Sequence, residues 1–215
     1  MRKNISCFVG ESGSGKTTYI NQIMKDKRFI DKVNLKLLVT GTTRKMRPGE
    51  VDGVDYHFMT EEEFLKIPSS ELIGSRSYYT LNNGTIYFFT KEEYVQTHTN
   101  LLCVTSPYQY ESYRNWVAKE NIRGNDYRLY MIYIDTDLKT RIIRCINRAK
   151  EDIDVFEVCR RAIQEKSEFE DVGKRLPEFI DPMMATNLCY IINGAESSIE
   201  ENCEAIKRFI LKFSK

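Results

Sequence analysis

The chain alternates short apolar runs with longer segments whose apolar residues recur at helical spacing. The apolar runs are bounded by polar residues or glycine and lie at 5–10, 35–40, 101–106, 129–135 and 189–193. Runs of this kind are typical of strands that are buried on both faces of a parallel sheet. The helical segments lie between them, at 16–25, 110–120, 138–148, 155–170 and 198–213. This alternation predicts an α/β domain with a mainly parallel central sheet.

The stretch from 41 to 91 interrupts the alternation. It is rich in Tyr, Phe and Thr, and it contains the turn sequence Asn82-Asn83-Gly84. Asn-Gly is a common hairpin turn because both residues tolerate a positive φ. We therefore expect a small β-rich insertion here, within a single domain of 215 residues.

The overall charge limits the classes of partner. Lys and Arg total 32 against 31 Asp and Glu, so the net charge is only +1. A chain so close to neutrality lacks the general basic field that attracts proteins to nucleic acid or anionic lipid. No apolar run approaches the length of a membrane span, and the first one is too short for a signal peptide. We expect a cytoplasmic protein that binds neither nucleic acid nor membrane.

Six cysteines are scattered along the chain without a C-x-x-C pair. Such spacing favours reduced, mostly buried thiols over a disulfide framework or a zinc site. The cysteines are Cys7, Cys103, Cys145, Cys159, Cys189 and Cys203.

The most specific motif follows the first apolar run. Residues 10–18 are Gly-Glu-Ser-Gly-Ser-Gly-Lys-Thr-Thr, which satisfies G-x-x-x-x-G-K-[ST] between a predicted strand and a predicted helix. Glycines allow backbone N–H groups to turn inward around phosphate oxygens, and the helix N-terminus adds its positive dipole. The expected phosphate-binding residues are Gly10, Ser12, Gly13, Ser14, Gly15, Lys16, Thr17 and Thr18.

Within this loop, Lys16 is expected to reach the β- and γ-phosphates, and the Thr17 hydroxyl to coordinate Mg²⁺. The alternative is a glycine-rich turn with a chance lysine, which leaves the strand–loop–helix context unexplained. The motif predicts that the chain binds a nucleoside triphosphate.

A second group of cations follows the second apolar run. Arg44 and Arg47 lie three residues apart in a short polar stretch, where they repel each other unless an anion lies between them. Guanidinium groups bind phosphate oxygens bidentately, so a phosphate monoester is the expected anion. A solvated basic loop is the alternative explanation for these residues.

Residues 42–58 carry the pattern T-T-R-x-x-R-x-G-E-x-x-G-x-D-Y-x-F without a mismatch. Together with the phosphate loop, this stretch resembles the guanylate kinase family, in which it begins the lobe that binds a nucleoside monophosphate. The resemblance implies a P-loop NTPase fold with three α/β/α layers over 1–215. Its parts would be a core of 1–40, 92–143 and 166–215, a β-rich NMP-binding lobe at 41–91 and a helical lid at 144–165.

The resemblance also implies an activity. It is the Mg²⁺-dependent transfer of the ATP γ-phosphate to GMP, dGMP or a related nucleotide. Arg44 and Arg47 would clamp the acceptor phosphate, Tyr56 would donate a hydroxyl to it, and Glu50 would orient an arginine. Further substrate-binding positions correspond to Thr40, Thr90 and Thr105.

Arg148 and Arg161 best match the family's lid arginines, which meet the charge on the transferring phosphoryl and exclude water. Arg141 and Arg144 share a helix face with Arg148, because they recur at three and four residues. The alternative is that these are surface arginines paired with nearby carboxylates, namely those of Glu151, Asp152 and Glu157.

Two polar residues at strand ends have competing interpretations. Asn193 matches a family position near the adenine of ATP, and a turn or helix cap explains it equally well. Asp135, at the end of the fourth apolar run, is interpreted as the N-cap of the helix that begins at Leu138.

The positions that recognise guanine in the family differ in this chain. Guanine presents N–H donors, so its pocket needs acceptors, ideally carboxylates. The family's acids correspond here to Gly74 and to the strand end that carries Cys103 and Thr105. Loss of both acids weakens discrimination on the order of 10³-fold, so the acceptor base stays open.

Three functions therefore stand beside one another. They are a nucleoside monophosphate kinase, a kinase of the same fold acting on a non-guanine nucleotide or a phosphosugar, and a non-catalytic interaction module. Guanylate-kinase-like interaction modules generally have a degraded phosphate loop, whereas the loop here is intact. We expect a monomer or a homodimer.

Overall fold

The structure is a computed structural model that describes residues 2–46, 49–79, 84–90, 100–148, 155–179, 187–195 and 197–214. Its core is a five-stranded sheet in the order β2-β7-β1-β8-β9, and every neighbouring pair is parallel. The strands are β1 (Lys3–Val9), β2 (Leu35–Leu37), β7 (Asn100–Thr105), β8 (Tyr127–Asp135) and β9 (Asn187–Asn193). All five predicted strands are present, and the predicted α/β class is confirmed.

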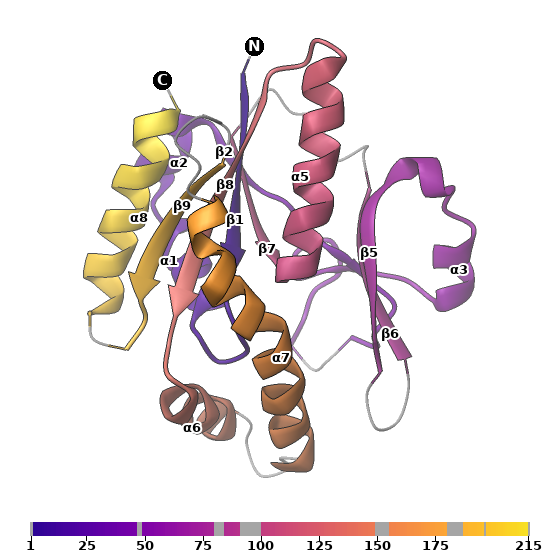
Figure 1. The fold of residues 1–215 in the computed structure, drawn as a ribbon, viewed down its shortest axis with the longest axis vertical. Coiled ribbons are helices and arrows are strands. Elements are labelled where there is room, and N and C mark those ends of the chain that lie inside the picture. Colours follow the sequence, from indigo (N-terminus) through magenta and orange to yellow (C-terminus); the bar gives the residue numbers. More distant parts are fainter. Residues whose placement is uncertain are drawn as a thin grey trace.

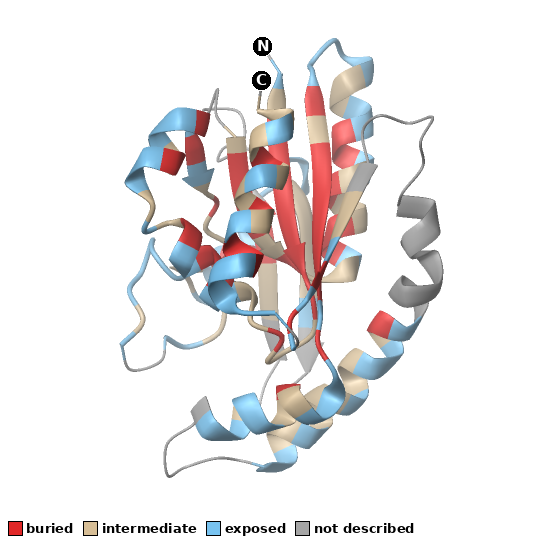
Figure 2. Cartoon of the chain, turned by 90° about the vertical axis from the view of Figure 1, so that its left-hand side faces the viewer, coloured by how far each residue is buried: buried red, intermediate tan, exposed pale blue. Residues whose placement is uncertain are grey.

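Helices cover both faces of this sheet, which appears as a buried layer between them (Figures 1 and 2). One apolar cluster includes residues of α5 (Pro107–Ile122) and α7 (Val155–Phe179). The opposite cluster includes residues of α1 (Lys16–Ile23), α2 (Lys27–Val33) and α8 (Ile199–Phe213). On β1, Ile5 belongs to the first cluster and Phe8 to the second, as expected for a strand that is apolar on both sides. The predicted three-layer α/β/α arrangement is confirmed.

Helix boundaries differ from the predicted ones where capping residues extend a helix. α5 begins before residue 110 because Ser106 and Gln109 form a capping box, and Pro107 occupies the first turn, where its missing N–H costs nothing. α2 was not predicted; it is a short helix capped by the Asp26 side chain, which accepts from Phe29 N at 3.1 Å.

The interpretation of Asp135 as an N-cap is wrong. Asp135 is the last residue of β8, and α6 (Leu138–Arg148) begins after two further residues. The first turn of α6 is instead held by Asp137, whose Oδ1 accepts from Thr140 N at 2.9 Å. β8 ends at Asp135, as the apolar run predicted, and the capping residue lies two positions beyond it.

The 41–91 region contains a second, mixed sheet in the order β4-β3-β6-β5 (Figure 1). Its elements are β3 (Gly41–Thr42), β4 (His57–Phe58), α3 (Glu61–Leu65), the 3₁₀ helix η1 (Ser69–Glu71), β5 (Leu72–Tyr79) and β6 (Gly84–Thr90). β3 pairs parallel with β4 and antiparallel with β6, and β5 pairs antiparallel with β6. The predicted β-rich insertion is therefore present, and we call this sheet the lobe sheet.

Two adjacent phenylalanines of β6 pack on opposite sides of the lobe sheet. Phe88 packs on Gly41, where an added Cβ would lie 2.3 Å from the ring, and its centroid is 4.8 Å from that of Phe64. Phe89 turns to the other side and meets the ring of Tyr113 on α5 at 4.9 Å between centroids. Phe89 thereby anchors the lobe sheet to the core.

The six cysteines are free thiols, as predicted. Cys7, Cys103 and Cys203 are buried, Cys145 and Cys189 are partly buried, and Cys159 is exposed. None of the helices in the described ranges is both long and apolar enough to cross a membrane.

Candidate active site

The predicted phosphate loop joins the end of β1 to the start of α1. Gly13 and Gly15 have φ values of 80° and 105°, which residues with a Cβ rarely adopt. An added Cβ at Gly13 would also lie 2.5 Å from the Arg141 carbonyl oxygen. Gly15 is the N-cap of α1 and makes no side-chain cap bond, so the first-turn N–H groups are directed to whatever lies in the loop.

Lys16 folds back over the loop. Its Nζ donates to the carbonyl oxygens of Gly10 at 2.6 Å and of Glu11 at 2.9 Å. Thr17 and Thr18, in the first turn of α1, are exposed. The cation and the hydroxyls that the motif predicts therefore lie on one loop, at the carboxyl edge of the parallel sheet where α/β proteins bind ligands.

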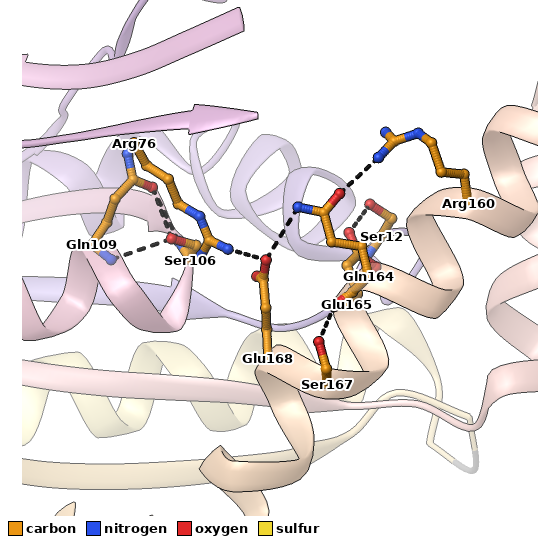
Figure 3. Close-up of polar contacts among 9 residues, drawn as sticks. All are labelled: Ser12, Arg76, Ser106, Gln109, Arg160, Gln164, Glu165, Ser167 and Glu168. Carbon is orange, nitrogen blue, oxygen red and sulfur yellow. Dashed lines mark hydrogen bonds and ion pairs between the residues drawn. The ribbon is translucent and has the colours of Figure 1, made fainter. Parts of the chain in front are cut away.

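A carboxylate from α7 lies against the same loop. Glu165 accepts from the Ser12 backbone N–H at 2.8 Å, and the Ser12 hydroxyl donates to it as well (Figure 3). Ser12 N is a donor of the kind that a phosphate oxygen would use. Glu165 was not predicted, because nothing in the sequence links a helix residue to a loop 153 positions earlier.

Arginines from α6 complete the surroundings of the loop. Arg141 is only 5% exposed and pairs with Glu11 at 2.7 Å and with Glu165 at 3.8 Å. Arg144 donates to the carbonyl oxygens of Gly194 at 2.9 Å and Ser14 at 3.4 Å. Their spacing on one helix face was visible in the sequence, and neither was nominated for the site.

The Glu11 carboxyl interacts electrostatically with both Arg141 and Glu165. Burial raises the pKa of its carboxyl above the ordinary value, the Arg141 guanidinium lowers it, and the neighbouring Glu165 carboxylate raises it. These charged side chains lie against the phosphate loop. A phosphate that binds in the loop would therefore change the electrostatic interactions among them.

The predicted lid residues are only partly described. The side chain of Arg148 lies outside the described part of the structure. Arg161 donates from Nε to Glu157 at 2.7 Å, and Arg160 makes a two-point pair with the same carboxylate. These hydrogen bonds lower the pKa of Glu157 to about 2, with that from Arg160 the largest cause. In this arrangement Arg161 is a paired helix arginine, which is the alternative that the sequence left open.

Asn193 is the last residue of β9 and holds the turn that follows it. Its Oδ1 accepts from Ala195 N at 3.0 Å, and its backbone carbonyl accepts from Asn202 at 3.2 Å. The turn explains an asparagine here, and a contact with adenine stays a prediction.

Arg44, which was predicted to bind the phosphate of the acceptor nucleotide, lies just after β3 of the lobe sheet. Arg44 makes a bidentate pair with Glu50, at 2.7 and 2.8 Å, and its guanidinium lies over the Tyr56 and Phe58 rings, 5.0 and 5.3 Å from their centroids. Burial opposes the charge, but the bonds with Glu50 and with Tyr87 outweigh it, so the pKa of Arg44 is raised. Its side chain is 12% exposed. The predicted role of Glu50, orienting an arginine, matches this geometry.

Of the other residues predicted to bind the acceptor nucleotide, some lie within the described part of the structure and some do not. Arg47 and the Thr90 side chain lie outside the described part. Thr40 is half-buried, and its carbonyl accepts from His57 N at 2.9 Å. Tyr87, which was not nominated, belongs with the clamp: its ring centroid is 5.8 Å from that of Tyr56, and its hydroxyl bonds Arg44.

Comparison with known proteins agrees with this geometry. A guanylate kinase family model matches residues 2–97, which include the phosphate loop and the Arg44 clamp. The guanylate kinase of Acinetobacter baylyi is 31% identical over 158 residues, which cover 68% of this chain and 64% of that protein. The chain belongs to the guanylate kinase family.

Other relatives refine the extent of the likeness. The guanylate kinase of Schizosaccharomyces pombe is 47% identical over 62 residues, which are 29% of each chain. The crystal structure of guanylate kinase from Anaplasma phagocytophilum has a TM-score of 0.56 at 21% identity, covers 97% of this chain and supports the fold. The chain spans less than two thirds of the length of these curated sequence relatives, so its own activity is a matter for proposal.

The positions that the resemblance matched to the family's base-recognising acids are packing positions in this chain. An added Cβ at Gly74 would lie 2.6 Å from Cβ of Ser112 on α5, so a larger side chain does not fit there. Cys103 is fully buried in the core, and Thr105 is 3% exposed beside the Cys7 thiol. Acceptor contacts by Thr105 stay a prediction.

The loop fits Mg²⁺ chemistry of the guanylate kinase type. Within the described residues, no three His, Cys, Asp or Glu side chains form a group that could hold a metal ion. A cation held by the exposed Thr17 hydroxyl, nucleotide phosphates and water needs no such group.

Proposed function

We propose that this chain transfers the γ-phosphate of ATP to a nucleoside monophosphate, with GMP or dGMP as the first candidate acceptor. One observation carries the proposal: two separate phosphate-binding elements belong to one family member. The first is the glycine-lined loop with Lys16, and the second is the Arg44–Glu50 clamp on the lobe sheet. A triphosphate site alone would serve many reactions, whereas a second clamp implies a second phosphate-bearing substrate.

In this proposal the loop binds the donor. Backbone N–H groups from Gly13 to Thr17 hold the β- and γ-phosphates, and Lys16 leaves the loop carbonyls to neutralise them. Bound Mg²⁺, held through Thr17, would neutralise further phosphate charge. Asn193, at the end of β9, would lie at the edge of the adenine.

The lobe sheet binds the acceptor. Arg44 and Arg47 hold its phosphate, Tyr56 and Tyr87 add hydroxyl donors, and Glu50 keeps Arg44 in position. An oxygen of the acceptor phosphate forms the new bond to the γ-phosphorus, and the bond from that phosphorus to ADP breaks. The products are ADP and a nucleoside diphosphate.

Positioning and charge neutralisation supply the catalysis, since phosphoryl transfer needs no protein nucleophile. Negative charge spreads over the oxygens of the transferring group, where Arg148 and Arg161 would meet it on closure of the lid. Arg141 and Arg144 already lie at the loop and support its shape.

The test is ADP release from ATP and Mg²⁺ in the presence of each ribo- and deoxynucleoside monophosphate in turn. Turnover highest with GMP or dGMP supports the proposal in full. Turnover highest with another base retains the kinase and replaces the acceptor. Silence with every monophosphate rejects the proposal and leaves a phosphosugar kinase or an interaction module.

A further inference from the structure

Arg76 lies on the same face of the lobe sheet as the phosphate clamp. It is the direct cross-strand partner of Tyr87, and Tyr87 in turn pairs with Thr42. Residues directly opposite one another in an antiparallel pair point to the same face. The row therefore runs from the clamp through Tyr87 to Arg76, on the strand farthest from the β4 end of the sheet.

The length of this row matches a nucleotide. Neighbouring strands are spaced by about 4.8 Å, so the row from β4 to β5 spans roughly 14 Å. A nucleoside monophosphate whose phosphate is held at Arg44 and whose base points along this row would bring that base to Arg76. Gly74 precedes it by two residues, so the position that recognises the base in the family and Arg76 belong to one strand segment.

Arg76 meets a carboxylate from the core. Its guanidinium pairs with Glu168 of α7, and Gln164 approaches the same carboxylate oxygen at 3.5 Å (Figure 3). Tyr108, which is 60% exposed at the start of α5, lies with its ring centroid 5.6 Å from the guanidinium. Donor, acceptor and aromatic face are thus gathered between the lobe sheet and the carboxyl edge of the core sheet.

Because the Arg76–Glu168 pair is largely buried, it adds little net free energy to the contact between the lobe sheet and α7. The two side chains are 16% and 15% exposed, and a pair removed from water loses much of its Coulomb gain to desolvation. Phe89 already anchors the lobe sheet through apolar contact. A shielded pair beside a ligand path is better explained by recognition of that ligand.

We propose that Arg76 and Glu168 recognise the acceptor base, and that they take over the task of the missing family acids. This inference rests on the proposed function. The base is guanine: Arg76 donates to O6, and the two oxygens of Glu168 accept from N1–H and from the 2-amino group. Tyr108 offers the base a stacking face.

The test measures equilibrium binding of GMP and of IMP, which lacks only the 2-amino group, by calorimetry without ATP. The wild type is expected to bind GMP on the order of 10-fold or more tighter than IMP, because a charge-assisted hydrogen bond is lost with that group. In Glu168→Gln the preference is expected to fall to about 2-fold or less, since the charge-assisted bond is lost on the protein side. Glu170→Gln, an exposed change on the same helix, is the matched control and keeps the wild-type ratio.

A charge swap separates recognition from a structural bridge. Arg76→Glu combined with Glu168→Arg restores attraction between the lobe and α7 but reverses the groups offered to the base. If the pair only holds the lobe, the swap recovers GMP affinity, and the inference is overturned. Equal losses for GMP and IMP in Glu168→Gln, or no GMP binding by the wild type, overturn it too.

These outcomes are distinct from failure of the proposed function, which is read from ADP release. Binding with the expected GMP preference and no transfer would leave base recognition standing and remove the kinase. If phosphate is transferred but Glu168→Gln leaves the preference for GMP over IMP unchanged, the kinase activity stands and base recognition by Glu168 is rejected.

Discussion

The two regions proposed to bind phosphate both contain an internal carboxylate, but they obtain it in opposite ways. In the acceptor clamp, Glu50 lies six residues from Arg44 and grips it bidentately. In the phosphate loop, Glu165 arrives from α7, 153 residues along the chain, and occupies donors of Ser12. Glu50 stabilises the Arg44 guanidinium, whereas Glu165 occupies a backbone N–H donor that a phosphate oxygen could use.

The difference separates a fixed site from a coupled one. Glu50 and Arg44 are close along the chain, so their pairing depends mainly on one short segment. Glu165 belongs to α7, so its contact with the loop depends on where that helix packs. We therefore expect donor binding to depend on the position of α7, and acceptor binding to depend on local geometry.

The largest effect is expected from Lys16→Ala. Removal of the cation at the β/γ-phosphates should lower kcat by about 10³-fold or more, because phosphoryl transfer depends on charge neutralisation there. Steady-state ADP release measures it. Lys25→Ala, exposed just beyond α1, is the control, and turnover like wild type in Lys16→Ala would remove the loop from the mechanism.

Arg44→Ala should have the next largest effect. Loss of a bidentate charged contact of about 3 kcal/mol predicts a rise in acceptor KM of about 10²-fold with a fall in kcat, and no change in the KM for ATP. Glu50→Gln should give a smaller effect of the same kind, since the arginine stays but is less well held. A defect confined to ATP would contradict the assignment of this segment to the acceptor.

Glu165→Gln probes the remote carboxylate. It should tighten ATP binding by about 10-fold, equivalent to about 1.4 kcal/mol, because an anion no longer competes for the Ser12 donors. Arg141 retains its pair with Glu11 in this variant. Calorimetry with a non-hydrolysable ATP analogue measures it, with Glu170→Gln as control. Weaker binding would mean that Glu165 organises the loop instead of competing with phosphate.

The smallest effect is expected from Glu157→Gln, which breaks the local pairs with Arg160 and Arg161. A pair on a partly exposed helix surface contributes about 0.5–1 kcal/mol, so Tm should fall by about 1–4 °C at pH 7. The folded-state pKa of Glu157 is lowered to about 2, so its contribution is present above the ordinary value near 4.5 and is lost as pH falls toward 2. Thermal melts of both proteins should converge at low pH, and a constant Tm difference would exclude the ion pair as the cause.

Much of the fold followed from local pattern. Buried parallel strands need apolar residues on both faces, and those runs located all five strands of the core sheet. The pattern missed α2, since a helix this short carries little periodicity and depends on the caps at Asp26 and Asn34. It misplaced the cap of α6, because Asp135 and Asp137 lie two residues apart and aspartate is a preferred N-cap residue at either position.

The residues of the candidate site likewise divide into those identified from the sequence and those understood only from the structure. The loop glycines, Lys16 and Arg44 were identified from short local motifs, and the role of Glu50 was implied by the family resemblance. Gly74 and Cys103 could not be understood until α5 and the core showed them to be packing positions. Tyr87 became part of the clamp only through its register with Thr42.

The amino-acid sequence by itself determined the strand–loop–helix of the phosphate loop and placed Arg44 and Glu50 close together along the chain, because backbone turns and short-range contacts depend on neighbouring residues. The tertiary structure decided which distant charges reach those sites. Glu165 at Ser12 and Glu168 at Arg76 meet partners 153 and 92 residues away, and only the packing of α7 over the sheet edge brings them there. The physical reason is that a long-range contact is set by where whole elements pack, which no single stretch of sequence encodes.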